Sequence, residues 1–224
     1  MLDILEAVRN RKSIRGYKPD PVPREVLEGI LSLAARSPSA MNTQPWEFTV
    51  VTGGVIDSIR KENTQALLSG EAPCPDIPVE SYKGVYKQRQ VDLAVDIFRL
   101  MGIAREDGAK RMEWMQRGFR FFDAPAAVII SADRSIEGSL WVFDLGAVAQ
   151  TICLAALDRG LGTCIEGQGV MFPRVIRKHT GIPESKNIIM SIAIGYPDWE
   201  FPANRLESGR EPLDNITSWH GFKD

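Results

Sequence analysis

The segment from Leu140 to Arg159 constrains the fold more than any other part of this sequence. It is the longest predicted helix, and it is apolar on almost every side: Trp141, Val142, Phe143, Leu145, Ala147, Val148, Ile152, Leu154, Ala155 and Leu157. A helix without a polar face has to be buried on most sides. At 1.5 Å per residue it is roughly 30 Å long, enough to cross a small domain. We therefore expect a core helix that a partner subunit also covers.

Shorter periodic segments precede and follow this helix. Helical spacing of apolar residues predicts helices near the N-terminus and at 24–36, 55–68 and 173–180, with two more between 82 and 122 that are broken near 102–107. Short apolar runs predict buried strands at 47–52, 126–132, 163–165 and 187–195. We find no internal repeat and no linker. The sequence therefore predicts a single α+β domain over residues 1–224, with enough hydrophobic residues to fill one core.

Composition and charge exclude several functional classes. The net charge of −2 gives no electrostatic reason to expect binding to nucleic acid or to an anionic membrane. Cys74, Cys153 and Cys164 are widely spaced, which is typical of a reducing compartment. We see no signal-peptide pattern and no apolar run of roughly 20 residues, so we expect a cytoplasmic protein. His179 and His220 are too few for a histidine metal site, and we predict no metal.

A polar loop at Ser37–Phe48 joins a predicted helix to a predicted strand. Pro38 and Pro45 bracket it, so the chain has to turn there. Ser39 and Asn42 belong to a crowded set of hydrogen-bonding side chains in this short, stiff segment. Such a loop can present several donors to a planar polar ligand. The alternative is an ordinary turn that only connects helix and strand.

A second polar cluster lies at Arg11–Arg15, just after the first predicted helix. Residues two apart in an extended backbone point the same way, so Arg11, Ser13 and Arg15 can converge on one anion.

The R-x-S-x-R pattern at 11–15 and the P-S-x-x-N-x-Q-P-W loop at 38–46 together resemble the nitroreductase family of FMN-dependent oxidoreductases. Segments 162–167 and 205–212 match further family motifs in the same order, so the resemblance runs from residue 4 to residue 222. It is most like the subgroup that acts on nitroaromatic acids, because the segment from 70 to 118 is longer than in compact members.

The resemblance implies a fold and an assembly. We expect a three-layer α/β/α sandwich with a central mixed, mainly antiparallel sheet, in an intertwined homodimer with FMN sites at the subunit interface. Residues from about 70 to 118 would form a helical insertion or lid, and residues from about 197 to 224 a C-terminal arm.

The resemblance also implies the cofactor-binding residues, which are Arg11, Lys12, Ser13, Arg15, Pro38, Ser39, Ala40, Met41, Asn42, Gln44, Arg120, Ile165, Glu166, Gly167 and Arg210. Arg11 and Arg210 are the phosphate candidates, and Arg15 would lie beside the flavin edge that gains negative charge on reduction. The segment at 38–44 would come from the opposite subunit. Arg117 aligns with a basic family position less securely than Arg120.

No side chain is predicted to act as a catalyst, because a flavin carries out the redox chemistry itself. Glu166 and Gly167 would approach the flavin N5 through their backbone, and the alternative is that Glu166 acts as a general acid. The family mechanism passes hydride from NADH or NADPH to N5, and then electrons to a nitroaromatic or quinone-like acceptor, with ping-pong kinetics. Reductive dehalogenation of halogenated phenols and a non-enzymatic flavin-binding module are the alternatives.

Overall fold

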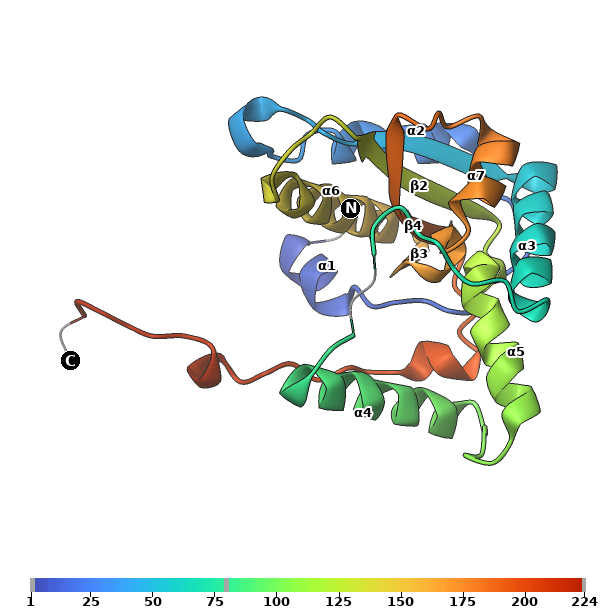
Figure 1. The fold of residues 1–224 in the computed structure, drawn as a ribbon. Helices are drawn as coiled ribbons and strands as arrows, with labels where there is room; N and C mark the ends of the chain where they lie inside the picture. The colour runs from blue at the N-terminus through green and yellow to red at the C-terminus, as the bar shows by residue number, and fades with distance from the viewer. Residues whose placement is uncertain (1–2, 79–80, 223–224) are drawn as a thin grey trace.

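A four-stranded sheet forms the middle of the fold, and its strands lie in the order β1 (Glu47–Thr52), β2 (Ala126–Asp133), β4 (Lys186–Gly195) and β3 (Gly162–Glu166) (Figure 1). The computed structural model describes residues 3–78 and 81–222. All neighbouring strands pair antiparallel. Within the described residues, parallel pairing occurs at one isolated bridge between Ser13 and Thr163. The predicted α+β class with a mainly antiparallel sheet is therefore confirmed.

Helices cover both faces of this sheet. The larger helices are α2 (Arg24–Ala34), α3 (Gly53–Leu68), α4 (Gly84–Leu100), α5 (Gly108–Phe119) and α6 (Leu140–Asp158), and the shorter ones are α1 (Ile4–Asn10) and α7 (Pro173–Thr180). Side chains of β2 alternate between the two faces, as the pleat of a strand requires. Val128 and Ile130 join the core beneath α2 and α6, whereas Ala127 and Ile129 join the core beneath α3 and α7. The expected three-layer sandwich is confirmed.

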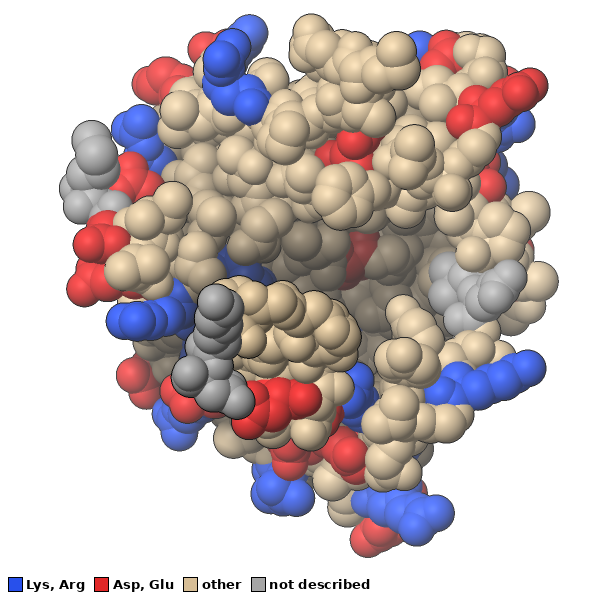
Figure 2. Space-filling view, turned by 90° about the vertical axis from the view of Figure 1, so that its left-hand side faces the viewer, with Lys and Arg blue, Asp and Glu red and all other residues tan. Residues whose placement is uncertain are grey.

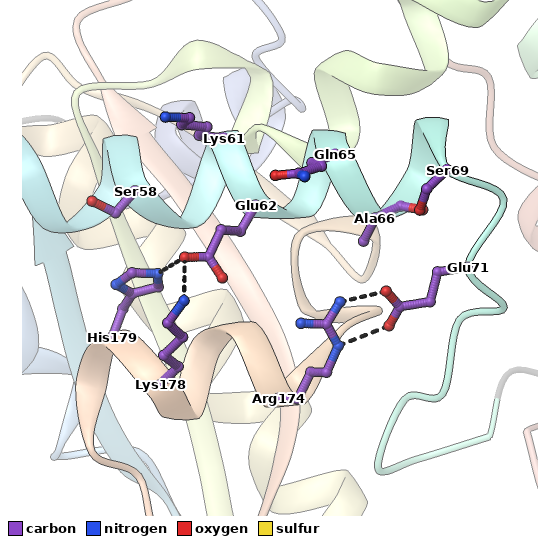
Figure 3. A pocket seen from close by; sticks show the side chains of 10 residues that line it. All are labelled: Ser58, Lys61, Glu62, Gln65, Ala66, Ser69, Glu71, Arg174, Lys178 and His179. Carbon is purple, nitrogen blue, oxygen red and sulfur yellow. Dashed lines mark hydrogen bonds and ion pairs between the residues drawn. The ribbon is translucent and has the colours of Figure 1, made fainter.

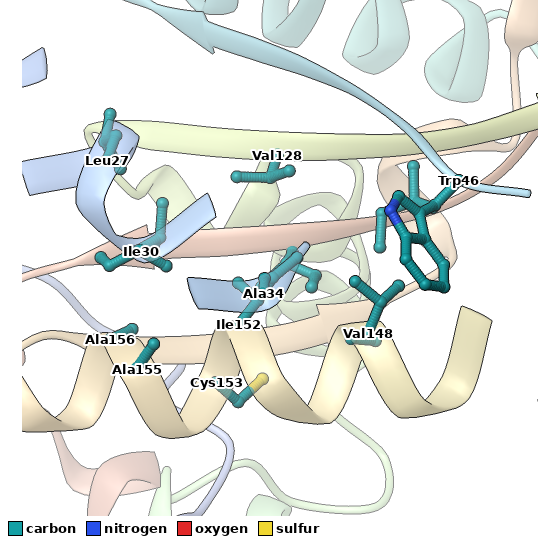
Figure 4. Close-up of a cluster of buried hydrophobic side chains, with 14 of the residues drawn as sticks. Leu27, Ile30, Ala34, Trp46, Val128, Val148, Ile152, Cys153, Ala155 and Ala156 are labelled. Carbon is teal, nitrogen blue, oxygen red and sulfur yellow. The ribbon is translucent and has the colours of Figure 1, made fainter. Parts of the chain in front are cut away.

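Helix α6 packs along the sheet but is not buried over its whole length. Ile152 and Ala156 are fully buried between the helix, the sheet and α2 (Figure 4). In contrast, Leu140 and Phe143 in its first turn are 72% and 78% exposed. Among helices of the described residues, α6 alone is long and apolar enough to cross a membrane, although core helices meet the same criterion. Its exposed first turn is the part that the single chain leaves uncovered.

The α4–α5 hairpin and the C-terminal segment lie outside the sandwich (Figure 1). The short helix η4 (Pro202–Arg205) packs beside α4, with Ala203 and Asn204 buried. Beyond it the chain runs past α4 and away from the body, so that its large side chains are mostly exposed: Leu213, Ile216, Trp219 and Phe222. The two aromatic residues among them, Trp219 and Phe222, are therefore not buried against their own chain.

Left-handed backbone at non-glycine residues is confined, in the described part of the chain, to two turns. One contains Met41, Asn42 and Gln44, with φ of 50°, 59° and 46°. The other is Phe121–Asp123, with three successive φ values of 56°, 52° and 60°. Each such residue costs roughly 1–3 kcal/mol, so surrounding contacts have to stabilise both turns. The first turn consists of residues in the predicted cofactor-binding set, and the second directly follows Arg120, which also belongs to that set.

Candidate functional site

A cavity of about 780 Å³ lies between the C-terminal end of α1, the residues that follow it, and the C-terminal segment. Its lining includes four cationic residues and one carboxylate: Arg9, Arg11, Lys12, Arg210 and Glu207. Ser208 also lines it, and the Arg210 guanidinium donates to the hydroxyl oxygen of Ser208 over 2.8 Å. The Lys12 ammonium lies 6.0 Å from the ring centroid of Trp199, which lines the same cavity. The fold therefore brings Arg11, Lys12 and Arg210 together, whereas Ser13 and Arg15, which the sequence predicted to converge with Arg11, do not line this cavity.

The Arg11–Arg15 segment lies directly against β3. The Ile14 N–H donates to the Thr163 carbonyl oxygen over 2.9 Å, and Ser13 bridges to the same strand residue. A Cβ atom added at Gly162 would lie 2.5 Å from Cγ1 of Ile14, so only glycine permits this approach. The contact places the first predicted motif beside Ile165–Gly167, which follows along the same strand.

Arg15 is held by three other parts of the chain. Its N–H donates to Oδ1 of Asn204 over 2.7 Å, and its carbonyl oxygen accepts a hydrogen bond of 3.0 Å from Arg117. Its guanidinium carbon lies 5.9 Å from the ring centroid of Phe122. Asn204 is 1% exposed and also donates to the Gly16 carbonyl oxygen. Asn204 was not predicted, because no local pattern shows that an amide 189 residues away holds Arg15.

Glu166 ends β3 with its side chain turned into the protein, and the residue is only 9% exposed. Its Oε1 accepts from the Ser191 hydroxyl over 2.5 Å, and its Oε2 accepts from the Gly169 N–H over 2.8 Å. Burial raises the pKa of this carboxyl to about 7, and hydrogen bonds from Ser191 and from the backbone of Gly169 and Gln168 only partly oppose it. The geometry gives the Glu166 side chain a role in fixing the loop at Gly167–Gly169, while the neighbouring Ile165 is 40% exposed.

Burial also makes the nearby thiols inert. It raises the pKa of Cys164 to about 12 and also raises the pKa of Cys153. Neither residue is therefore a thiolate nucleophile at neutral pH. Tyr17 is tied into the same region, since its hydroxyl donates to the Ile14 carbonyl oxygen over 2.8 Å.

The predicted loop at 38–44 is fixed on α6, away from the Arg11 cavity. The Ala40 N–H donates to Oδ1 of Asp144 over 3.1 Å, and the Gln44 N–H donates to Oγ of Ser39 over 2.9 Å. Gln44 also donates through its side chain to the Asn42 carbonyl oxygen over 3.2 Å. In the described part of the chain, none of these residues lines the Arg11 cavity. The chain thus carries the two groups of predicted cofactor-binding residues at separate places.

Arg120 and Arg117 both bind Asp123. Arg120 does so through two hydrogen bonds of 2.8 and 3.2 Å, and it does not line the Arg11 cavity. Arg117 reaches Asp123 over 2.9 Å and is the residue that also contacts the Arg15 backbone. Arg117, which aligned with the family's basic position less securely than Arg120, is therefore the residue beside Arg15.

A separate polar cavity of about 530 Å³ lies between α3 and α7 (Figure 3). Glu62 accepts from Lys178 over 2.7 Å and pairs with His179 over 2.8 Å. Arg174 forms a two-point ion pair with Glu71 across the same cavity. His179 thus packs at the C-terminal end of α7, where it pairs with Glu62. The cavity contains none of the predicted cofactor residues, and its charges largely neutralise one another.

Comparison with known proteins adds to this geometry. The sequence profile of the Nitroreductase family matches residues 8–196. A 4-nitrobenzoate reductase from Nocardioides sp. (strain LMS-CY) is 34% identical over 216 residues, which cover 92% of this chain and 85% of that protein. A chloronitrobenzene nitroreductase from Comamonas testosteroni is 31% identical, with 96% and 95% covered. The crystal structure of the FMN and NADPH-dependent nitroreductase NfnB from Sphigopyxis sp. strain HMH aligns with a TM-score of 0.94 at 30% identity, over 99% of this chain and 100% of that one.

Proposed function

Because this chain belongs to the nitroreductase family, we propose that it is an FMN-dependent oxidoreductase that uses NADPH or NADH to reduce nitroaromatic compounds. The observation that carries the proposal is the cavity in which Arg11, Lys12 and Arg210 meet. Cations that come from the two ends of the chain and line one cavity are suited to a phosphate group.

The residues of this cavity fit the phosphate and ribityl part of FMN. Each charge-assisted hydrogen bond from an arginine or lysine to phosphate contributes about 1.5–3 kcal/mol. Ser208 adds a hydroxyl donor, and Trp199 adds an apolar wall. When bound, FMN would supply the redox chemistry, accepting hydride from the nicotinamide and passing electrons to the acceptor. The protein binds and orients the flavin and excludes competing reactions.

Arg15 is the residue that we propose to tune the flavin. Its backbone is fixed at both the N–H and the carbonyl, by Asn204 and Arg117, so little of its position depends on the ligand. A cation fixed beforehand stabilises developing negative charge without reorganisation. It would favour the reduced flavin, and roughly 30 mV in midpoint potential accompanies each 1.4 kcal/mol.

We further propose that the active form is an intertwined homodimer. Apolar side chains stay exposed along α1 and the first turn of α6, where Ile4 is 72% and Phe143 78% exposed. Figure 2 shows the side from which the arm extends, with a hollow lined mostly by uncharged residues and charges largely around its rim. A second chain would cover these surfaces, and its loop at 38–44 would complete the site that begins at Arg11.

The acceptor is expected to be a nitroaromatic compound, because both curated relatives described above are named for such substrates. Quinone-like acceptors and ping-pong turnover belong to the same proposal. Exposed side chains of α4 and α5, among them Tyr86, Met112 and Met115, support the hairpin as a lid over an aromatic acceptor.

The first test is the visible absorption spectrum of the purified protein, before and after anaerobic addition of NADPH or NADH. We expect a yellow protein that releases FMN on denaturation, is bleached by a nicotinamide, and recovers its colour with 4-nitrobenzoate. A colourless protein that fails to bind added FMN would refute the proposal. Bleaching without any acceptor turnover would favour a flavin-binding module, and turnover of iodinated phenols alone would favour dehalogenation.

A matched pair of variants tests the phosphate site. Arg11→Met should raise the Kd for FMN at least about tenfold, the equivalent of 1.4 kcal/mol. Arg24→Met removes the same charge from a residue on α2 that pairs with Glu28, and it should leave the Kd unchanged. Equal affinities for the two variants would remove Arg11 from the site. Initial-rate plots of NADPH against 4-nitrobenzoate should give parallel lines if turnover is ping-pong.

A further inference from the structure

The left-handed turn at Phe121–Asp123 lies between α5 and β2, and its residues are two phenylalanines and an aspartate. None of these is glycine, which adopts this conformation readily. Phe121 is 0% and Phe122 5% exposed, so both rings lie inside the protein, while Asp123 is exposed. A turn of this kind persists only where its surroundings determine it, and such strain is concentrated at functional sites.

Two arginines from different helices hold this turn. Arg60 on α3 donates through Nε to the Arg120 carbonyl oxygen over 3.0 Å and through its terminal nitrogen to the Ala124 carbonyl oxygen. It therefore binds the carbonyl just before the turn and the one just after it. Arg117 on α5 donates to the Phe122 carbonyl oxygen over 3.3 Å and binds the Asp123 carboxylate. Side chains of Arg60 and Arg117 are only 16% and 19% exposed.

The clamped turn directs its two aromatic rings toward two different parts of the candidate site. Phe122 lies beneath the Arg15 guanidinium, with 5.9 Å between the guanidinium carbon and the ring centroid. Phe121 presses on the loop that follows β3, since a Cβ atom at Gly169 would lie 2.3 Å from its ring. Glu166 holds that same loop through the Gly169 N–H. One turn thus contacts both Arg15 and the loop that directly follows the backbone segment predicted to meet the flavin.

Asn63 strengthens the connection between α3 and the loop. It is fully buried, three residues after Arg60 on the same helix, and donates to the carbonyl oxygens of Phe119 and Gly169 over 3.1 and 2.9 Å. Residues three apart lie on one face of a helix. Arg60 and Asn63 therefore fix the turn and the loop from a single face of α3.

We infer that the turn at Phe121–Asp123 is a positioning element that sets Arg15 and the Glu166–Gly169 loop relative to each other, and that Arg60 is its positioning residue. The expected effect on bound flavin rests on the proposed function. The positioning role itself rests on the hydrogen bonds within this chain. Arg60 itself lines none of the cavities described above. It acts through the backbone carbonyls on either side of the turn.

The test compares Arg60→Met with Lys61→Met. Both variants remove one positive charge at neighbouring positions of α3, but Lys61 is exposed and lines the polar cavity between α3 and α7. The first readout is amide hydrogen exchange in the flavin-free protein. In Arg60→Met, the amides of Arg15 and Gly169 should exchange at least about tenfold faster, because the turn packs Phe122 against the Arg15 side chain and Phe121 against Gly169. In Lys61→Met they should exchange at the wild-type rate.

The second readout uses the flavin-loaded protein. Arg60→Met should weaken binding of reduced FMN about tenfold more than binding of oxidised FMN, which corresponds to a midpoint potential about 30 mV lower. Arg60→Lys keeps the charge with fewer donors and should give intermediate values in both readouts. If Arg60→Met does not fold, hydrogen exchange and midpoint potential are measured on Arg60→Lys instead.

Three outcomes decide the matter. Faster exchange at both Arg15 and Gly169, with a lowered potential, supports the inference. Faster exchange confined to α3, α5 and the turn itself, with an unchanged potential, overturns it and leaves Arg60 with a local structural role. A wild-type protein that binds no FMN refutes the proposed function, and the exchange rates then decide the positioning role alone.

Discussion

Replacing Glu166 by glutamine should change how the stability of the protein depends on pH. The buried carboxyl has a pKa of about 7 in the folded protein, against its ordinary value of 4.5, because burial disfavours the charged form. Glutamine has the shape of the protonated acid. Its carbonyl oxygen can accept from the Gly169 N–H, and its NH₂ group can donate to the Ser191 hydroxyl oxygen. The variant thus keeps both contacts and removes only the titration.

The direction and size of the effect follow from linkage. A folded-state pKa above the unfolded value means that the folded protein binds more protons between pH 4.5 and pH 7. Stability therefore falls as the pH rises through this window and levels off above it. At 1.36 kcal/mol per pKa unit, the full loss is about 3 kcal/mol, and most of it falls between pH 5 and pH 8. Glu166→Gln has no titrating carboxyl at this position, so its stability does not fall in this way as the pH rises.

Urea unfolding at pH 5 and pH 8 measures the effect. The flavin-free protein is used at one fixed concentration, because ligand binding and dimerisation also shift apparent stability. We expect the stability of Glu166→Gln relative to wild type to rise by about 2–3 kcal/mol from the lower to the higher pH. Glu200→Gln, at a side chain that is 92% exposed, is the control. Stability curves for Glu166→Gln and wild type that run parallel would show that the carboxyl ionises normally in the folded protein.

Three further predictions follow from the same contacts. Arg15→Ala should lower the flavin midpoint potential by about 30–60 mV, since a charge-assisted contact of about 1.5–3 kcal/mol to the reduced flavin is lost. An unchanged potential in a redox titration would show that Arg15 does not lie beside the flavin. Gly169→Ala should destabilise the protein by about 1–3 kcal/mol, because the new Cβ would lie 2.3 Å from the Phe121 ring. A urea midpoint equal to that of the wild type would contradict that contact. Asp76→Asn removes the buried carboxylate that pairs with Arg177, whose side chain is 9% exposed, and leaves it the 80% exposed Glu184, so the change should cost about 3 kcal/mol, visible as a lower Tm; a Tm equal to wild type would count against the buried pair.

Local patterns in the sequence were sufficient to predict the helices and strands. The periods of apolar residues differ between helix and strand, and glycine and proline mark the ends of segments. Gly181, for example, ends α7 in the left-handed conformation with φ of 76°. The two helices between 82 and 122 and their break also agree with the structure. These features depend on neighbours only a few residues apart, so the sequence contains them directly.

The candidate site was predictable only in part. The resemblance named Arg11, Lys12 and Arg210, and folding brings them to one cavity although they lie at opposite ends of the chain. It also named Arg120, whose side chain is occupied by Asp123 three residues later. A charge count cannot foresee that pairing, because it depends on the unusual turn between α5 and β2.

What the sequence by itself determined is the set of elements and the motifs that carry the family resemblance. Only the tertiary structure decided how Arg15 is held, because Asn204 and Arg117 reach its backbone from distant segments. It also decided that two phenylalanines adopt left-handed backbone, against their local preference. Such a conformation is stabilised by long-range hydrogen bonds, such as that from Arg60, which form only after α3 has packed beside the turn. Local propensity contains no information about them.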